Sequence, residues 1–460
     1  MKNLAATIYR FTIAFISIVN YTNAQSAIGL LRYNDNFTFI KDDSLKKGFT
    51  RLKYIEFSEN NFISFGGEIR EQLQLYHNIN FGDLPPKFSS INAHQLNHRL
   101  MLHANIESGN HFRFFIQMNN TLQFMNVNPP SPEIDVNQLS LHQAFSEFLF
   151  DKWKIRIGRQ EVFYGNHRIF TVREGPNTRQ TFDGMVVKKV FKNGTIDFFA
   201  LSKTISKKFI FDDEFGKERS FGFYSNLFLI EKRIGLDFYG LNFQSEQRKY
   251  NHNSGPENRQ TVGFRLFSDL KQFNFEIEGT YQTGQFNSLS IDAYNVFADV
   301  NITILQKMKA RIGLAANISS GDKNNSDNKL NTYNLLFAKP AYGLAIPLGS
   351  ANMISIYPYI KINPVPKLNI LTQVFFLQIN SDQDGLYSPS MIMVRPQPET
   401  SSNSNSMYMG TFFVLETSYQ YSENFSLSFD ASYFNAGGFL KETGKGKDLT
   451  YVSFKSTFKF

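Results

Sequence analysis

The residues best suited to chemistry in this sequence are cationic side chains that crowd one stretch, residues 154–184. The stretch carries Lys154, Arg156, Arg159, Arg168, Arg173 and Arg179. A guanidinium presents a planar fork of donors that matches a carboxylate two atoms at a time, so a cluster of arginines favours carboxylated solutes. Asp183 follows within reach of the cluster. The competing interpretation, about equal for any one residue, is that such acids pair with the arginines and only brace the protein.

Four further arginines fall on the polar faces of alternating segments, namely Arg70, Arg99, Arg113 and Arg265. Acids on the same or neighbouring segments are the partners expected of an ordinary charge ladder, namely Glu68, Glu107, Glu276 and Glu278. If these polar faces line a water-filled pore, side chains of both charges surround the solute. An excess of arginine at the narrow part of such a pore favours anions. We therefore take these four, with Arg156, Arg159, Arg168, Arg179 and Asp183, as the candidate conduit for a solute.

Motifs of known enzyme classes are missing from the sequence. There is no G-x-S-x-G, no H-E-x-x-H, no phosphate-binding glycine loop and no zinc-ligand spacing. Cysteine is absent, which excludes disulfides and thiolate metal sites. Asp212, Asp213 and Glu214 could hold a divalent cation, but a solvated loop tip explains them better. We expect no catalytic residue, no cofactor and no resident metal.

The elements that must position these charges alternate between apolar and polar residues with a period of two. Phe65, Ile69, Leu73 and Leu75, for example, fall on one face, and Glu68, Arg70, Gln72 and Gln74 fall on the other. About 18 segments of roughly 10 to 15 residues share this pattern, a length suited to a tilted crossing of a membrane. The polar faces are too continuous for a dry core. Since every backbone group must be satisfied inside hydrocarbon, such a sheet has to close on itself.

The connections between these segments alternate between tight turns and long polar links. Tight turns are expected at Gly109-Asn110, Asp151-Lys152, Asn193-Gly194, Glu231-Lys232, Leu270-Lys271, Lys307-Met308, Val365-Pro366 and Glu423-Asn424. Long links are expected at about 79–92, 125–140, 160–180, 204–219, 245–259, 284–290, 319–349, 380–409 and 436–447. Short periplasmic turns and long extracellular loops are typical of bacterial outer-membrane barrels. The fold predicted is all-β, a transmembrane antiparallel up-and-down β-barrel of about 18 strands.

The two ends of the sequence fit export to the outer membrane. Lys2 and Arg10 precede a short apolar run, which predicts a signal peptide over residues 1–24. Without these two cations the formal net charge falls from +8 to +6, so the remaining chain stays basic and favours anionic partners. Residues 25–62 form a predicted periplasmic segment that either plugs the barrel or leads into it, and residues 63–460 form the barrel. A last strand ending in Phe460 resembles the signal read by barrel-assembly machinery.

The stretch 154–184 also carries motifs of a known family. Gly158-Arg159-Gln160, Tyr164-Gly165 with Arg168, and Phe182-Asp183-Gly184 resemble the alginate export porins, and Gly321-Asp322 with Asn331, Tyr333, Asn334 and Phe337 is a weaker match. The resemblance implies an 18-stranded barrel lined by basic and acidic side chains that passes an anionic uronic-acid polymer.

Together these features predict an outer-membrane, porin-like channel that passes anionic saccharides or similar carboxylated solutes passively. The expected partners are that solute, outer-membrane lipid and lipopolysaccharide, and barrel-assembly machinery during insertion. No nucleic acid is expected, and the chain is expected to be a monomer. Two alternatives stay open: a barrel whose loops plug the lumen and which acts as a surface anchor or binding protein, and a small lipid-modifying or proteolytic barrel.

Overall fold

The computed structural model describes residues 28–41, 48–83, 90–125, 134–230, 233–251, 253–395 and 404–460. The predicted signal peptide and the predicted turn at Glu231-Lys232 lie outside these residues. None of the helices in the described part of the chain has the length and apolarity of a membrane span.

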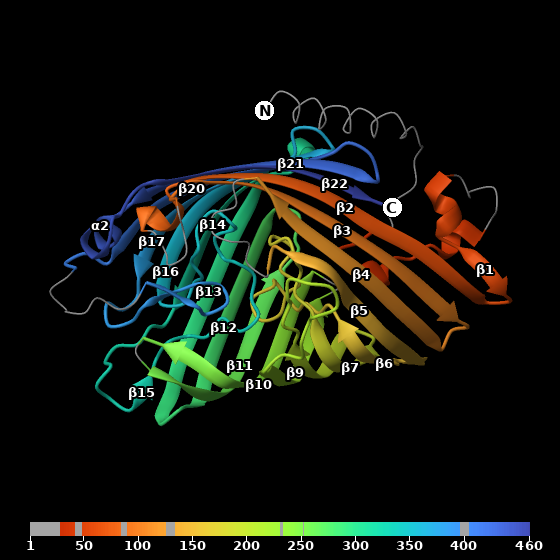
Figure 1. Cartoon of the computed structure of the whole chain (residues 1–460), viewed down its shortest axis with the longest axis horizontal. Coiled ribbons are helices and arrows are strands. Elements are labelled where there is room, and N and C mark those ends of the chain that lie inside the picture. The colour runs from red at the N-terminus through yellow and green to blue at the C-terminus, as the bar shows by residue number, and fades with distance from the viewer. Residues whose placement is uncertain are drawn as a thin grey trace.

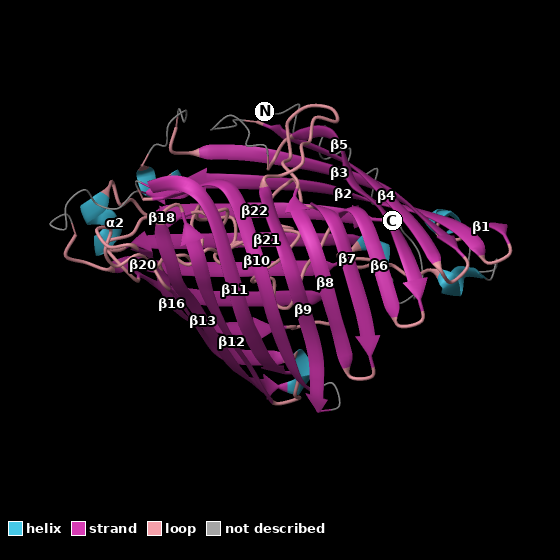
Figure 2. Cartoon of the chain, turned by 90° about the horizontal axis from the view of Figure 1, so that it is seen from below, coloured by secondary structure: helices cyan, strands magenta, loops and turns pink. Residues whose placement is uncertain are grey.

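Within the described residues, 18 long antiparallel strands form one closed barrel, as the sequence predicted. Each strand pairs with the next along the chain, and the first and last strands pair from Glu68 with Lys459 to His77 with Thr450. Figures 1 and 2 show the resulting wall from two directions. The barrel strands are β2 (Asn61–His77), β3 (Ala93–Ser108), β4 (Phe112–Phe124), β5 (Asn137–Phe150), β6 (Trp153–Gln160), β7 (Phe182–Phe191), β8 (Gly194–Lys203), β9 (Glu218–Ile230), β10 (Ile234–Tyr250), β11 (Asn253–Ser268), β12 (Phe273–Phe286), β13 (Leu289–Leu305), β14 (Ala310–Ser319), β16 (Met353–Ile362), β17 (Leu368–Ile379), β20 (Tyr408–Gln420), β21 (Phe425–Ala436) and β22 (Leu449–Lys459).

The wall reverses the usual distribution of polar and apolar side chains. On β2, Glu68 and Arg70 are buried at 2% and 1% exposure, whereas Phe65 is 38% exposed. On β12, Gln282 is fully buried while its neighbour Tyr281 is 47% exposed. Polar residues thus face the filled interior and apolar residues face outward, which is the arrangement that a surrounding lipid phase requires.

The connections at one rim are the short turns that the sequence predicted. Each described one joins two consecutive barrel strands, as between β3 and β4 or between β5 and β6. In Figure 1 the C-terminus lies toward this rim and α2 (Gly438–Thr443) lies toward the other.

Two predicted long links are wrong. Residues 245–259 and 284–290 belong largely to strands, because β10 runs to Tyr250, β11 begins at Asn253, β12 ends at Phe286 and β13 begins at Leu289. Outward-facing apolar residues such as Val262 and Tyr281 form a belt around the barrel, here the apolar belt. These strands extend beyond the belt, and their outward-facing residues there, such as Gln244 and Asn258, are polar and exposed. Where a strand is polar on its outer face as well, its sequence no longer alternates between apolar and polar residues. Such a strand resembles a loop in sequence.

The height of the wall is therefore uneven. β10 and β13 have 17 residues each, whereas β6 has 8 and β7 and β8 have 10 each. The low part of the wall is where the link between β6 and β7 folds inward.

Within the described residues, three segments pack in the lumen. We call residues 161–181 the first inner loop and residues 331–351 the second inner loop. The two loops meet at Phe170 and Phe337, whose ring centroids lie 4.9 Å apart. The yellow segment between β6 and β7 lies inside the barrel in Figure 1. The third segment precedes the barrel: Tyr33 packs edge-on against Phe145 of the inner wall at 5.3 Å, so this part of the N-terminal segment enters the barrel.

The remaining elements are short. They are the strands β1 (Ile55–Ser58), β15 (Lys329–Leu330), β18 (Leu386–Tyr387) and β19 (Met393–Arg395), and the 3-10 turns η1 (Arg32–Asn34), η2 (Thr38–Lys41), η4 (Gly48–Leu52), η5 (Ile79–Gly82) and η6 (Gln306–Met308). The β18–β19 hairpin packs at the rim that carries the long loops, and Tyr387 of this hairpin contacts Tyr250 at the top of β10.

Candidate solute chamber

The motif segments Gly158-Arg159-Gln160 and Phe182-Asp183-Gly184 pair with each other across the neighbouring strands β6 and β7. Gly158 and Gly184 face each other in the β6–β7 register, beside the pair of Arg159 with Asp183. A Cβ on Gly158 would come within 2.3 Å of the Ala144 carbonyl, and one on Gly184 within 2.1 Å of the Ala200 carbonyl. Both glycines also have positive φ, so the motif fixes a close approach of strands β5 to β8. The Arg159 guanidinium donates two hydrogen bonds to the Asp183 carboxylate, at 2.8 and 3.1 Å.

Three of the predicted arginines converge on Glu174 of the first inner loop, which the sequence analysis did not select. Arg99 donates to this carboxylate, Arg179 lies 3.2 Å from it and Arg70 lies 3.6 Å from it. Its position inside the protein would by itself raise the pKa of Glu174, but the three guanidinium groups outweigh that effect and hold the pKa well below its usual range. This charge network ties the loop to β2 and β3.

Arg113 and Arg156 contact Tyr33 of the N-terminal segment. Both pair with Glu147, at 3.2 and 2.6 Å, and Arg113 also lies 3.2 Å from Glu107. The Arg156 guanidinium lies 4.0 Å from the centre of the Tyr33 ring, and Arg113 donates to the Tyr33 carbonyl at 2.9 Å. These two arginines therefore hold Tyr33 inside the barrel.

Arg265 and Arg168 lie near the wall from β10 to β13. Arg265 bonds to Asp237 at 2.9 Å and to Glu276 at 3.0 Å. Arg168 lies 3.4 Å from Glu278 and stacks on the ring of Phe297. The nine residues predicted as a conduit thus divide into four groups around the wall, and every arginine among them has a carboxylate within 4 Å.

A cavity of about 560 Å³ lies above the low part of the wall, between the first inner loop, the link from β8 to β9, the bulge in β10 and the tip of the β18–β19 hairpin. We call it the chamber. Four of its lining residues are cationic and three are acidic, namely Arg173, Arg179, Lys203 and Lys217, and Asp213, Glu218 and Glu246. Arg179 is the one predicted conduit residue among these, so the structure brings a different set of charges together.

Arg173 differs from the predicted arginines because it bonds only to neutral groups. Its guanidinium donates to the Ala338 carbonyl at 3.0 Å, the Pro389 carbonyl at 2.9 Å and the Ser390 hydroxyl at 2.6 Å. No carboxylate of the described residues lies within 4 Å of it. Burial lowers the pKa of Arg173 to about 10, so the side chain remains charged at neutral pH. It is a buried cation in the chamber wall whose charge is not neutralised by a direct partner.

Arg248 lies behind this side of the chamber and contacts two of its lining residues, Glu218 and Ser390. It lies 3.0 Å from Glu218, which also accepts from Lys203 at 3.4 Å, and it donates to the Ser390 carbonyl at 3.2 Å. Two arginines from distant segments, Arg173 and Arg248, therefore hold the tip of the hairpin over the chamber.

The sequence held a partial signal for these missed residues. Glu174 is the single acid between Glu161 and Asp183 in an arginine-rich stretch, so several arginines can be expected to form ion pairs with it. Arg173 stood in the predicted cluster but could not be distinguished from its neighbours. Lys203 lies at the end of β8 and Arg248 at the bulge of β10, and no local pattern encodes that loops fold against these wall positions.

The closed barrel, its outward apolar face and its charged, loop-filled interior define a bacterial outer-membrane, porin-like channel protein. The family model described as alginate export matches residues 61–453, and the chain belongs to this family. No curated protein sequence matches the chain.

Solved structures of porins share the fold. OccK2 (OpdF) of Pseudomonas aeruginosa in complex with glucuronate is 11% identical over 89% of this chain and 99% of its own, with a TM-score of 0.59. OccD3 (OpdP) of Pseudomonas aeruginosa is 12% identical, covers 89% and 92% and has a TM-score of 0.59. A BenF-like porin from Pseudomonas fluorescens Pf-5 is 10% identical, covers 88% and 100% and has a TM-score of 0.58.

Proposed function

We propose that the protein is a passive outer-membrane channel for anionic, carboxylated saccharides or similar solutes, and that it is not an enzyme. The observation that carries this proposal is the chamber with Arg173 in its wall. A solute carboxylate that reaches this guanidinium meets a cation whose protein partners are carbonyl and hydroxyl oxygens, so it does not have to displace a carboxylate of the protein.

The size and chemistry of the chamber support a small sugar acid. A volume of about 560 Å³ lies within the usual range of small-molecule sites. Thr178, Gln180 and Thr204 also line it and offer hydroxyl and amide groups to sugar hydroxyls. Glucuronate, bound in the complex of OccK2, is a carboxylated sugar of this kind.

Planar bilayers test the proposal. We expect the purified chain to conduct in a potassium chloride gradient with a reversal potential on the anion side, and we expect sodium glucuronate to reduce the chloride current from the side of the long loops. Glucose at the same concentration is the matched control and should reduce it less. Absence of conductance, or selectivity for potassium, would overturn the proposal.

One observation favours a second candidate, a plugged barrel that acts as a surface binding protein. The inner loops and Tyr33 fill much of the lumen with packed side chains, such as the Phe170–Phe337 contact. A chain that binds glucuronate in solution but stays closed in the bilayer at all voltages would have this function.

A further inference from the structure

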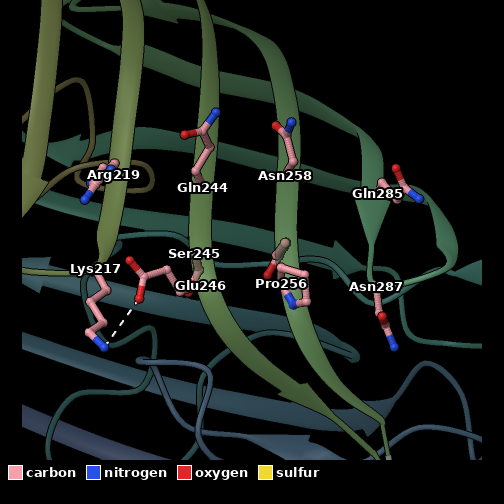
Figure 3. A pocket seen from close by; sticks show the side chains of 10 residues that line it. Lys217, Arg219, Gln244, Ser245, Glu246, Pro256, Asn258, Gln285 and Asn287 are labelled. Atoms are coloured by element: carbon pink, nitrogen blue, oxygen red, sulfur yellow. Dashed lines mark ion pairs between the residues drawn. The ribbon is translucent and has the colours of Figure 1, made fainter.

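The outer surface of the barrel carries a row of polar side chains across four neighbouring strands. Arg219 of β9 is paired with Gln244 of β10, Gln244 with Asn258 of β11, and Asn258 with Gln285 of β12. All four are exposed and point away from the lumen, because their neighbours along each strand, such as Ser220 and Phe243, are buried. Figure 3 shows these side chains side by side on the outer face.

This row lies just above the apolar belt. The next outward row toward the short turns, Phe221, Asn242, Gln260 and Thr283, is mixed. The row after that contains Phe223, Val262 and Tyr281, and the last two are 51% and 47% exposed. Two rows span about 14 Å along a strand, or roughly 10 Å along the membrane normal for a tilted strand. The polar row therefore lies at the depth of the lipid headgroups rather than in open water.

The surface is hollowed at this level. A groove of about 380 Å³ is lined by the polar row and by six further residues, namely Lys217, Ser245, Glu246, Pro256, Glu257 and Asn287. A bulge between Ser245 and Arg248 shifts the register of β10 here, and Pro256 has no N–H with which to continue the ladder. The groove follows from these two interruptions of the regular sheet.

The charges of the groove favour an anion. Lys217 is paired with Glu246 at 3.4 Å, and the described part of the chain places no carboxylate within 4 Å of the Arg219 guanidinium. The second acid of the groove, Glu257, is buried and paired with Arg259. Arg219 therefore adds a positive charge that no acid of the groove neutralises directly, and the amides of Gln244, Asn258 and Gln285 add donors and acceptors suited to hydroxyl and phosphoryl oxygens.

We propose that this groove binds the phosphorylated sugar headgroup of a glycolipid in the outer leaflet, with Arg219 and Lys217 on phosphate and the amide row on the sugar. Its acyl chains then lie along the apolar belt below, on Phe221, Val262 and Tyr281. Lys217, Ser245 and Glu246 line both this groove and the chamber, so the two sites adjoin at the top of the wall, whereas Arg219 and the three amide side chains line the groove alone.

Native mass spectrometry of the full chain in detergent micelles tests the proposal, with bisphosphorylated lipid A as the probe. We expect one lipid A molecule to be retained by the wild type, and the Lys217→Gln/Arg219→Gln variant to bind it at least about tenfold more weakly, since each cation near an anionic headgroup contributes about fivefold. The matched control is Lys271→Gln/Lys307→Gln, which removes two exposed cations at the short-turn rim and should bind lipid A like the wild type. Heat-modifiable gel mobility checks that both variants are folded.

Phosphatidylglycerol and phosphatidylcholine separate the possible occupants. Weaker retention of both lipids than of lipid A supports a phosphorylated sugar headgroup. Equal binding of lipid A to the wild type and the groove variant would overturn the proposal, as would equal binding of lipid A and phosphatidylcholine to the wild type. A dimer that the groove variant dissociates would assign the groove to a second copy of the chain and would overturn it as well.

Discussion

Arg159 and Asp183 occupy directly paired positions on β6 and β7, and two hydrogen bonds of 2.8 and 3.1 Å join their side chains. Arg159 also donates to the Leu141 carbonyl at 3.2 Å, and Thr204 donates to Asp183 at 3.1 Å. The pair thus connects β5, β6, β7 and the start of the link from β8 to β9. It belongs to the frame of the barrel beneath the chamber.

Arg159→Ala should destabilise the barrel, because it leaves the largely buried Asp183 carboxylate without its cation. We expect a loss of about 2–3 kcal/mol in the free energy of unfolding. Urea unfolding in micelles, followed by tryptophan fluorescence, measures it. The double variant Arg159→Met/Asp183→Leu removes both charges and should lose less; a double variant as unstable as Arg159→Ala would show that the lone carboxylate is not the cause.

Gly184→Ala should also destabilise the barrel, since the new methyl group meets the Ala200 carbonyl at a backbone φ of 150°. The expected cost is at least about 2 kcal/mol, read from the same urea titration. Gly29→Ala is the control, because the nearest atom to its Cβ lies 3.7 Å away. A similar midpoint for the two variants would show that the close strand contact at Gly184 tolerates a side chain.

Arg173→Gln should weaken anion preference without unfolding the barrel. The amide can retain part of the bonding to Pro389 and Ser390, but the charge in the chamber wall is lost. We expect the chloride-to-potassium permeability ratio to fall about two- to threefold in planar bilayers. Lys271→Gln removes an exposed cation far from the chamber and should leave the ratio unchanged. Unchanged reversal potentials in Arg173→Gln would remove this residue from the conduit.

Asp322 should make the loop after β14 sensitive to pH. Burial, with a smaller effect of Asp384, raises the pKa of Asp322 to about 6. Because the folded loop binds this proton more tightly than the unfolded chain, the loop should be most stable below about pH 4 and lose stability as the pH rises through 6. We expect about 1–2 kcal/mol after allowance for solvent, measured by hydrogen exchange of residues 320–331 corrected for intrinsic rates. Asp322→Asn should abolish the pH dependence, and its persistence in that variant would assign it to another group.

Tyr33→Ala should loosen the N-terminal segment. The variant loses ring contacts with Phe115 and Phe145 at 6.0 and 5.3 Å and the stacking of Arg156. We expect a larger single-channel conductance than in the wild type, together with a loss of about 2–4 kcal/mol of packing. Tyr33→Phe keeps the ring and should conduct like the wild type. If Tyr33→Ala did so too, the segment would not restrict the conduit.

Local patterns in the sequence were sufficient to predict the wall. The alternation around Arg70 or Glu278 records which face of a strand meets lipid, and tight turns such as Asp151-Lys152 record where strands reverse. The pattern failed at 245–259, because a strand that leaves the membrane loses its apolar face. It also failed for the chamber, because the contacts of Arg173 with Ala338, Pro389 and Ser390 span between 165 and 217 residues of sequence. Which loops fold inward depends on such long-range contacts.

Phe460 also binds the segment that precedes the barrel. Arg32 donates to the carbonyl of Phe460 at 2.9 Å and to that of Gly67 at 2.8 Å, and Gly67 and Phe460 exchange backbone hydrogen bonds of 2.8 and 3.0 Å. The docking place of Arg32 is therefore made by two chain segments that come together only where the first and last barrel strands meet. An Arg32 side chain bound there reports that the cylinder is closed.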